Sequence, residues 1–334
     1  MGDFAEPACG VGTSMATLME RAPEIEVESL DTASPGGLAL FARQARDAAR
    51  RSPTCVWVFP TRSIVDRPDL VLRLAVCRWM FQHGAVRLHL HEFRRLRRKL
   101  RYPITLALAL ATDRIVVSSA SEAAAVRRAG FGWAARGREV RVVPPVNGTT
   151  PTDAEIDVVA GPSSADRRRT LGVFGMHRPD KGDQWLADIL RRLDRRFDRV
   201  VVAGRGWEDV EWPPDLLARY EVVLRGHVER ADLAAELAGW GLAVAPFTEG
   251  PHDGRLSLRT PLAFGVPTLT TATTSADRGD LTLAPSHLFR ADAVALGTLP
   301  DLTPEQRRAG AREVATFEAD VTRRLAEALF GPGP

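Results

Sequence analysis

Short apolar runs alternate with amphipathic helical patterns along almost the whole chain of 334 residues. Strand-like runs in the first half fall at residues 25–30, 55–59, 85–90, 114–118 and 140–144, with helical patterns at 38–50, 70–82, 94–111 and 121–129. Runs in the second half fall at 170–174, 199–203, 221–224, 242–247 and 267–271, with helices at 183–193, 232–240 and 255–264. Such alternation is typical of parallel sheets covered by helices on both faces. The sequence therefore predicts an α/β protein.

The length of the chain exceeds that of one typical domain, so two domains are expected. Residues 148–165 are rich in Thr, Asp, Pro, Ser and Gly and have weak periodicity, which predicts a linker between the two halves. We expect a Rossmann-like domain over residues 1–150, a linker over 151–168, a second Rossmann-like domain over 169–303 and a C-terminal segment over 304–334. The helix predicted at 304–329 follows the second domain and is able to cross back to the first.

Composition and charge limit the classes of protein to consider. The formal net charge of +3 suits an anionic ligand and is too small to predict nucleic-acid binding. Cys9, Cys55 and Cys77 lack metal-ligand spacing and predict reduced thiols in the cytoplasm. The first basic residue is Arg21, unlike a secretory signal, and the longest apolar run, 104–111, is far shorter than the roughly 20 residues that span a bilayer. A cytoplasmic protein, soluble or peripheral, is expected.

The segment with the strongest chemical signal is residues 170–182, in which a strand leads through a glycine turn into a helix. Helix N-termini carry unsatisfied N–H groups and attract anions. Arg178 would add a planar fork for phosphate oxygens, and Lys181 would add a compact positive charge. Lys181 is also one of only two lysines among 45 basic residues, the other being Lys99. These features predict a phosphate site, and a solvated basic turn is the alternative.

This segment resembles the donor-phosphate loop of retaining glycosyltransferases with the GT-B fold, particularly those of glycosyltransferase family 4. In that family an Arg and a Lys–Gly pair contact the diphosphate of the sugar nucleotide, and the matching residues are Arg178, Lys181 and Gly182. Other segments resemble the family's motifs in the family's order: the glycine loop at 10–13, the histidine motif at 88–93, strand segments at 112–119 and 142–148, the turns near base and ribose at 201–206 and 224–228, and the acidic motif at 245–250 with its following strand at 263–267.

The resemblance implies two Rossmann-like, doubly wound parallel-sheet domains facing a central cleft. It implies a hexosyltransferase that moves a sugar from a UDP-, GDP- or dTDP-type donor to a glycan, lipid or small-molecule acceptor, with retention of anomeric configuration. It implies neither an obligatory cofactor nor a metal, and the sequence has no Asp-x-Asp pair at a strand end. The residues it assigns are His91 and Glu249 for catalysis and Gly10, Gly12, Arg178, Lys181, Gly182, His227, Val228, Gly250 and Thr260 for donor binding.

The chain departs from the family in the acidic motif, which normally carries two glutamates eight positions apart. Glu249 matches the first glutamate, which holds a sugar hydroxyl in the family. Counting eight positions onward gives Ser257, and counting back from the following strand gives Thr260. The second glutamate, which grips the ribose in the family, is therefore absent. Asp253 and Arg255 are candidates to replace it.

His91 is the best catalytic candidate, because it follows a predicted strand at the sheet edge where ligands of α/β proteins bind. It is able to hydrogen-bond a sugar hydroxyl or to move a proton. His89 lies on the same face of the strand, deeper in the sheet. A purely structural role in local hydrogen bonds is the alternative for both histidines.

The basic run from Arg94 to Arg101 has two interpretations. On a helix its positive face would contact anionic lipid at a membrane surface or attract an acidic acceptor. Alternatively, it is an ordinary solvated helical face.

Three other functions compete with glycosyl transfer. A nicotinamide-dependent oxidoreductase is suggested by Gly10-x-Gly12-x-x-Met15 and by Asp31, although Met15 replaces the third glycine and Lys181 is left unexplained. A sugar-nucleotide epimerase would share the two-domain architecture. The missing second glutamate suggests a non-catalytic homologue that only binds a sugar nucleotide.

Overall fold

The computed structural model divides the chain into two compact units. Unit 1 comprises Met1–Gly148 and Ala319–Pro334, and unit 2 comprises Thr149–Glu318. Within them the structure describes residues 10–21, 37–52, 54–60, 69–91, 93, 98–131, 139–161, 165–178, 181–193, 197–248, 250–271, 281–291, 296 and 299–331.

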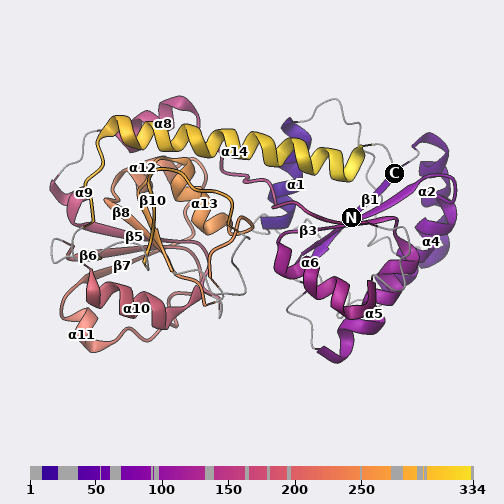
Figure 1. The fold of residues 1–334 in the computed structure, drawn as a ribbon, viewed down its shortest axis with the longest axis horizontal. Coiled ribbons are helices and arrows are strands. Elements are labelled where there is room, and N and C mark those ends of the chain that lie inside the picture. The colour runs from indigo at the N-terminus through magenta and orange to yellow at the C-terminus, as the bar shows by residue number, and fades with distance from the viewer. Residues whose placement is uncertain are drawn as a thin grey trace. The chain divides into compact units, whose positions relative to one another are not determined.

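Unit 1 is built on a parallel sheet (Figure 1). Its described strands run in the order β1-β2-β3-β4, each hydrogen-bonded to the next in sequence. Its elements are α1 (Gly10–Arg21), α2 (Gly37–Arg51), β1 (Thr54–Pro60), α4 (Asp69–Met80), β2 (Ala85–His91), α5 (Arg98–Ala111), β3 (Arg114–Val117), α6 (Ala120–Val126), the π-helical turn η2 (Arg127–Phe131) and β4 (Glu139–Val142).

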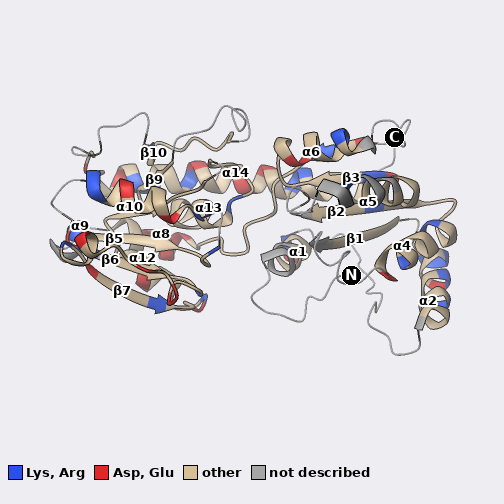
Figure 2. Cartoon of the chain, turned by 90° about the horizontal axis from the view of Figure 1, so that it is seen from below, with Lys and Arg blue, Asp and Glu red and all other residues tan. Residues whose placement is uncertain are grey.

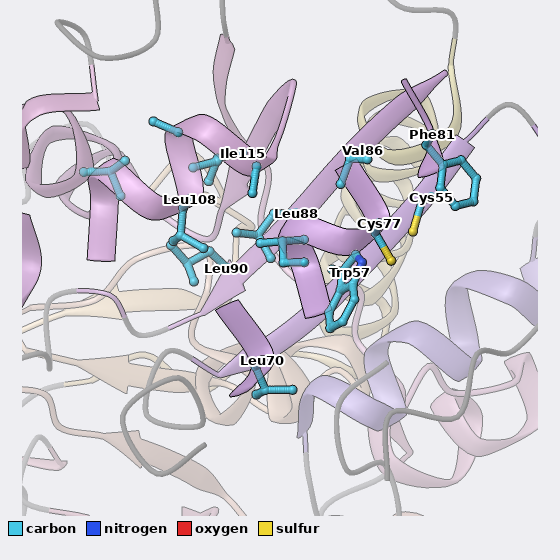
Figure 3. Close-up of a cluster of buried hydrophobic side chains, with 14 of the residues drawn as sticks. Cys55, Trp57, Leu70, Cys77, Phe81, Val86, Leu88, Leu90, Leu108 and Ile115 are labelled. Atoms are coloured by element: carbon cyan, nitrogen blue, oxygen red, sulfur yellow. The ribbon is translucent and has the colours of Figure 1, made fainter. Parts of the chain in front are cut away.

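One face of this sheet forms the larger core of unit 1. Alternate residues of β2, namely Val86, Leu88 and Leu90, are fully buried there. Residues of α2, α4, α5 and α6 pack against them, so these four helices cover the same face. Figure 3 shows part of this core, in which Cys55 and Cys77 lie beside Trp57. Both cysteines are free and buried.

The opposite face of the sheet receives the end of the long helix α14 (Pro304–Phe330). Arg87 of β2 and Arg114 of β3 are both buried. Their guanidinium groups donate hydrogen bonds to the carbonyl oxygens of Leu329 over 2.8 Å and Ala328 over 2.9 Å. The last carbonyls of a helix have no partner within the helix and carry partial negative charge. The two arginines therefore provide hydrogen-bond donors for the last carbonyl groups of α14 and hold this end of the helix against the sheet.

Unit 2 contains a six-stranded parallel sheet in the order β10-β9-β8-β5-β6-β7. Helices α10 and α11 lie on one side of it and α8 and α12 on the other (Figure 1). Its elements are α8 (Asp153–Ala160), α9 (Ala165–Arg169), β5 (Thr170–Phe174), α10 (Asp183–Arg192), β6 (Arg199–Ala203), α11 (Pro214–Leu217), β7 (Glu221–Gly226), α12 (Leu233–Ala238), β8 (Leu242–Ala245), α13 (Leu256–Ala263), β9 (Thr268–Thr270), β10 (Leu288–Arg290) and the first part of α14.

A glycine in strand β5 allows a tryptophan side chain to pack directly against the sheet of unit 2. Gly172 of β5 lies beneath Trp240, and a Cβ atom at this position would lie 1.9 Å from the indole ring. Trp240 is buried and packs with Leu237 and Phe264 on this face. A side chain at residue 172 would therefore displace the indole from the sheet.

The predicted strands agree with the structure wherever the structure describes them, with ends that differ by two residues or fewer. The predicted strand at 25–30 lies outside the described residues. Strand β10 and the short helices α9 and α11 are not among the predicted elements.

Residues 148–165, which the sequence predicts as a linker, contain helix α8 at Asp153–Ala160. Thr152 and Glu155 form a reciprocal capping box at its start. Arg230 also donates hydrogen bonds to both carboxylate oxygens of Glu155, over 2.5 and 2.9 Å. These bonds lower the pKa of Glu155 to about 2. The buried residues of the helix are Ile156, Val159 and Ala160. This apolar face is short and lies within a segment rich in Thr, Asp and Pro, so the sequence pattern did not predict a helix here.

Candidate functional site

The loops with the strongest sequence signal lie at the topological switch point of the unit 2 sheet. The chain leaves β5 toward β6 on one side and returns to β8 on the other, so β5 and β8 are neighbours with diverging connections. Ligands of open α/β sheets bind outside the carboxyl ends of strands at such a point. The two loops that begin there are residues 175–182 after β5 and residues 246–255 after β8.

The loop after β5, residues 175–182, is held by its backbone and by two glycines. Gly175 has φ of +96° and Gly182 has φ of +68°, conformations that other residues rarely adopt. The N–H of Gly175 donates to the carbonyl of Ala203 over 2.8 Å, and the N–H of His177 donates to the carbonyl of Arg205 over 2.8 Å. The first residues of the loop are therefore held against the end of β6 and the turn after it.

Lys181 lies inside this site, with only 7% of its surface exposed. Its Nζ donates to the carbonyl of Phe174 over 3.0 Å and to Oγ of Ser257 over 2.6 Å. It also lies 5.4 Å from the ring centroid of Phe247. These three partners are uncharged, and they orient the ammonium group.

Gly182 brings the two loops together. A Cβ atom at this position would lie 3.2 Å from the backbone nitrogen of Thr248 and 3.3 Å from the carbonyl carbon of Phe247. Gly182 is also the N-cap of α10 and provides no side-chain hydrogen bond to the first turn. The N-cap residue therefore leaves the first N–H groups of α10 without a side-chain partner of its own, at a position that favours an anion. Arg178 lies half-buried in the same loop, and its carbonyl accepts the N–H of Lys181 over 2.8 Å.

The loop after β5 is also supported by contacts among three side chains, Trp207, His177 and Asp183. The sequence did not predict this role. Trp207 Nε1 donates to the carbonyl of Gly175 over 2.9 Å, and its ring lies 4.9 Å from that of His177. His177 Nε2 in turn lies 2.9 Å from the carboxylate of Asp183, the first residue of α10. The turn following β6 was recognised by its glycines, but nothing in the local sequence indicates that Trp207 contacts another loop.

Other predicted donor residues of unit 2 lie in different surroundings. Thr260 is buried in α13, where its hydroxyl lies 2.9 Å from that of Thr149. His227 follows β7 and lies 3.4 Å from the carboxylate of Glu229, with its side chain exposed to solvent. Val228 packs against a core beside β6. Gly250 has φ of +85° in the loop after β8.

Three predicted site residues belong to unit 1, and one cannot be placed. Gly10 and Gly12 lie in the first turn of helix α1, and His91 is the last residue of β2. Glu249 lies outside the described residues. In the basic run from Arg94 to Arg101, residues 94–97 also lie outside them, while residues 98–101 begin α5.

The suggestion that Asp253 replaces the second glutamate is wrong. Asp253 is buried, and its carboxylate accepts hydrogen bonds from the N–H groups of Thr282 and Leu283 over 2.9 and 3.0 Å, and from the Thr282 hydroxyl. Its oxygens therefore anchor residues 282–283 instead of facing a ligand. Arg255 precedes α13, and its guanidinium lies 4.8 Å from the ring centroid of Phe247, the same ring that Lys181 contacts.

Two searches of the described residues were negative. No group of three or more His, Cys, Asp or Glu side chains among them is arranged to hold a metal ion. None of the helices that the structure describes is both long and apolar enough to cross a bilayer.

Comparison with known proteins links the fold to glycosyltransferases. No protein-family model matches the sequence. No curated protein sequence matches it either. HepE of Anabaena, solved with UDP and glucose, has a TM-score of 0.58 and 13% identity, over 95% of this chain and 89% of that one. The Escherichia coli trehalose-6-phosphate structure with UDP-2-fluoro glucose has a TM-score of 0.56 and 11% identity, over 97% and 96%. Sucrose-phosphate synthase of Thermosynechococcus elongatus has a TM-score of 0.52 and 14% identity, over 91% and 81%.

At such low identities the similarity establishes the fold alone. Both units consist of a parallel sheet with helices on its faces, as in these glycosyltransferases. The expectation of two Rossmann-like domains is confirmed. The chain therefore has the GT-B fold of glycosyltransferases.

Proposed function

We propose that the chain is a glycosyltransferase that moves a sugar from a nucleotide-diphosphate sugar to an acceptor, with retention of anomeric configuration. The observation that carries the proposal is the position of Lys181. It is a buried cation, oriented by Phe174 and Ser257, beside a helix N-terminus whose N-cap is a glycine, at the switch point of a GT-B fold. In such a position a diphosphate would find both charge and N–H donors.

The diphosphate is also the leaving group of the proposed reaction. When the bond between the sugar and the diphosphate breaks, negative charge grows on the departing phosphate oxygens. Lys181 and Arg178 would stabilise that charge, and positioned cations are an effective means of doing so. The hydrogen bonds from Lys181 to Phe174 and Ser257 would keep this cation in place before reaction.

The remaining assignments follow the resemblance and are proposals. His91 and Glu249 would contact the transferred sugar, His227 and Val228 the ribose or base, and Gly250 the donor. Gly10 and Gly12 open helix α1, whose N-terminus would favour the donor phosphate. Thr260 would act only indirectly, because it is buried against Thr149.

We also propose that the two domains bind different substrates. Donor binding would belong to residues 169–303 and acceptor binding to residues 1–150, with 304–334 as a C-terminal helical segment. The donor would be of UDP, GDP or dTDP type, the sugar a hexose, the acceptor a glycan, lipid or small molecule, and the place of action the cytoplasm.

The direct test supplies the protein with UDP-, GDP- and dTDP-hexoses, with and without a panel of glycan, lipid and small-molecule acceptors. The proposal expects acceptor-dependent release of nucleoside diphosphate and a new glycoside whose anomeric configuration matches the donor. Interconversion of sugar nucleotides without acceptor would indicate an epimerase, and oxidation of the sugar with reduction of NAD would indicate an oxidoreductase.

One observation favours a second candidate, a sugar-nucleotide-binding protein without transferase activity. Ser257 stands eight positions after Glu249, where the family has a glutamate, and its hydroxyl is engaged by Lys181. Tight binding of a sugar nucleotide without turnover across the same acceptor panel would support this candidate over the enzyme.

A further inference from the structure

Unit 2 contains a cavity of about 200 Å³ between its sheet and helix α12. The cavity is lined by Thr170 of β5, Val201 of β6 and Arg225 of β7, and on the helix side by Glu236. Thr170 begins the five-residue strand β5, whereas the proposed diphosphate site follows the end of that strand. Because a strand rises about 3.3 Å per residue, the length of β5 separates the two by roughly 15 Å. The cavity is therefore distinct from the proposed donor site.

Arginine side chains provide most of the charge around this cavity. Among the described residues that line it, Arg167, Arg199 and Arg225 are cationic, and Glu236 is the single carboxylate. Glu236 lies 3.4 Å from Nε of Arg225, and it also accepts a hydrogen bond from Nε1 of Trp240 over 3.0 Å. Figure 2 shows basic positions at α9, which contains Arg167, and along β7, which contains Arg225. The described lining therefore has a net positive charge.

Arg167 is the buried member of this group, with only 4% of its surface exposed. Its Nε donates to the carbonyl of Trp240 over 3.1 Å, and its Nη1 donates to the carbonyl of Gly161 over 3.3 Å. These two bonds orient the guanidinium group beside the cavity. A buried charge is costly unless an opposite charge accompanies it, so an anion in the cavity would stabilise Arg167.

A second buried arginine lies close enough to Arg167 to repel it. This residue is Arg307 in α14, and no described group accepts a hydrogen bond from its Nε or Nη1. Burial and, to a smaller extent, repulsion by Arg307 lower the pKa of Arg167 to about 10. Burial also lowers the pKa of Arg307. A negative charge beside these two cations would offset both effects.

Arg199 and Arg225 connect the cavity with solvent. Their side chains are 38% and 49% exposed, and the carboxylates paired with them, those of Glu221 and Glu236, lie 3.5 and 3.4 Å away. Ion pairs at the surface contribute little free energy, so a ligand replaces them at small cost. The planar guanidinium groups of these arginines match the geometry of phosphate oxygens.

We propose that this cavity binds a phosphate group, with Arg167 on its buried side and Arg199 and Arg225 on its exposed side. A phosphate oxyanion accepts several charge-assisted hydrogen bonds at once, which suits a group of arginines. Sites for drug-sized ligands measure about 300–1,000 Å³, so this smaller cavity admits inorganic phosphate or a small phosphomonoester and excludes a whole sugar nucleotide. The ligand therefore differs from the proposed donor.

Calorimetry of the full chain in a chloride buffer, with inorganic phosphate and separately with glycerol 3-phosphate, tests this proposal. We expect binding that also raises Tm, because a ligand of the folded state stabilises it. Tighter binding of glycerol 3-phosphate would assign the cavity to a small phosphomonoester, and tighter binding of phosphate would assign it to the inorganic ion. Binding of neither by the folded protein would overturn the proposal.

Two variants separate this cavity from the proposed diphosphate site. Arg199→Gln with Arg225→Gln should weaken binding of the phosphate probe by about tenfold or more, because charge-assisted hydrogen bonds are lost. Lys181→Ala removes a cation of the proposed diphosphate site and should retain the phosphate bound in the cavity. The reverse pattern would place the phosphate at the proposed diphosphate site and overturn this inference.

A matched control tests whether net charge alone explains the loss. Arg46→Gln with Arg50→Gln removes the same charge from two exposed arginines of α2 in unit 1, and it should bind phosphate as wild type does. Equal losses in the two double variants would overturn the assignment to the cavity. All of the replaced arginines are at least partly exposed, and circular dichroism checks that each variant is folded.

Discussion

Lys181 donates a hydrogen bond from Nζ to Oγ of Ser257 over 2.6 Å, and this bond joins the loop after β5 to helix α13. Ser257 stands eight positions after Glu249, where the resemblance expects a glutamate. A carboxylate at that distance would pair with the ammonium group and offset its charge. The Ser257 hydroxyl orients Lys181 and adds no negative charge of its own. The departure from the family motif therefore changes the electrostatics of the proposed phosphate site as well as the ribose contact.

The first prediction concerns His91, the last residue of β2. If this side chain contacts the sugar during transfer, His91→Ala should lower kcat by roughly 10²-fold, the size of a typical acid–base contribution. Donor affinity should stay within about twofold, because the cations proposed to bind the diphosphate, Arg178 and Lys181, belong to unit 2. Steady-state kinetics and calorimetry measure the two effects. His83→Ala, which changes an exposed histidine before β2, is the control. Near-normal turnover in His91→Ala would leave His91 a structural residue.

The second prediction concerns a buried ion pair between α13 and α14. Arg259 is fully buried and Glu318 nearly so, and Nε of Arg259 donates to Oε1 of Glu318 over 2.8 Å. Removing one charge leaves the other buried and uncompensated, so Glu318→Gln should lower the free energy of unfolding by about 3–5 kcal/mol. Urea denaturation of wild type and Glu318→Gln measures this difference in the free energy of unfolding.

Two comparisons sharpen this measurement. The double variant Arg259→Met with Glu318→Leu should recover most of the lost stability, because it removes both buried charges. Glu327→Gln breaks an exposed pair with Arg323 on the same helix and should leave the free energy of unfolding nearly unchanged, because solvent screens such a pair. Similar losses in Glu318→Gln and Glu327→Gln would contradict the assigned role of burial.

The third prediction is a pH dependence set by His287. Burial lowers the pKa of His287 to about 4, and its Nε2 lies 2.9 Å from the carbonyl of Leu262, to which the neutral ring donates. The unfolded chain, with a pKa near 6.5, binds the proton more readily than the folded one. Stability from this residue is thus complete above about pH 6.5 and is lost as pH falls toward 4, by about 3 kcal/mol in total.

His287→Gln isolates this effect, because its amide can still donate to Leu262 and does not titrate. Between pH 7 and pH 4 the unfolding free energy of wild type should fall by about 3 kcal/mol more than that of the variant. His227→Gln replaces an exposed histidine and should follow wild type. Parallel pH profiles for wild type and His287→Gln would show that the pKa of His287 is the same in the folded and unfolded chains, which would contradict the assigned effect of burial.

The fourth prediction concerns the backbone contact that supports the loop after β5. A Cβ atom at Gly204 would lie 2.2 Å from the carbonyl oxygen of Gly175, so Gly204→Ala must displace residues 175–182 or β6. Overpacking of this kind destabilises by about 1–3 kcal/mol, and the displaced loop should also bind diphosphate more weakly. Gly239→Ala, whose Cβ would lie 3.3 Å from its nearest atom, is the control. Unchanged diphosphate affinity in Gly204→Ala would separate this contact from the site.

Hydrophobic periodicity in the sequence predicted the strands because both sheets are parallel and buried, which makes their strands nearly continuous apolar runs. Helix α8 was missed because its capping box and three buried residues lie within a polar segment of the type that usually forms loops. Hydrophobic periodicity therefore identifies a strand or helix only when its apolar face is long enough.

The site was partly predictable for a related reason. Lys181 was identified because lysine is rare in this chain and follows a glycine turn. The assignment of Asp253 failed because its carboxylate binds Thr282 and Leu283, about thirty residues away, and spacing within one motif contains no information about such contacts. Trp207 was missed for the same reason, since its partner Gly175 belongs to another loop.

The measurement closest to the proposed chemistry is calorimetry of diphosphate binding at Arg178 and Lys181. The ligands are the nucleoside diphosphate that most raises Tm in a screen of UDP, GDP and dTDP, and its parent nucleoside. A charge-assisted hydrogen bond contributes about 1.5–3 kcal/mol, so Lys181→Ala should weaken diphosphate binding by roughly 10- to 100-fold and leave nucleoside binding nearly unchanged. Arg178→Ala should act in the same direction, and the double variant should lose less than the sum, because both residues hold one ligand. Unchanged diphosphate affinity in Lys181→Ala would place the phosphates elsewhere and contradict the assignment.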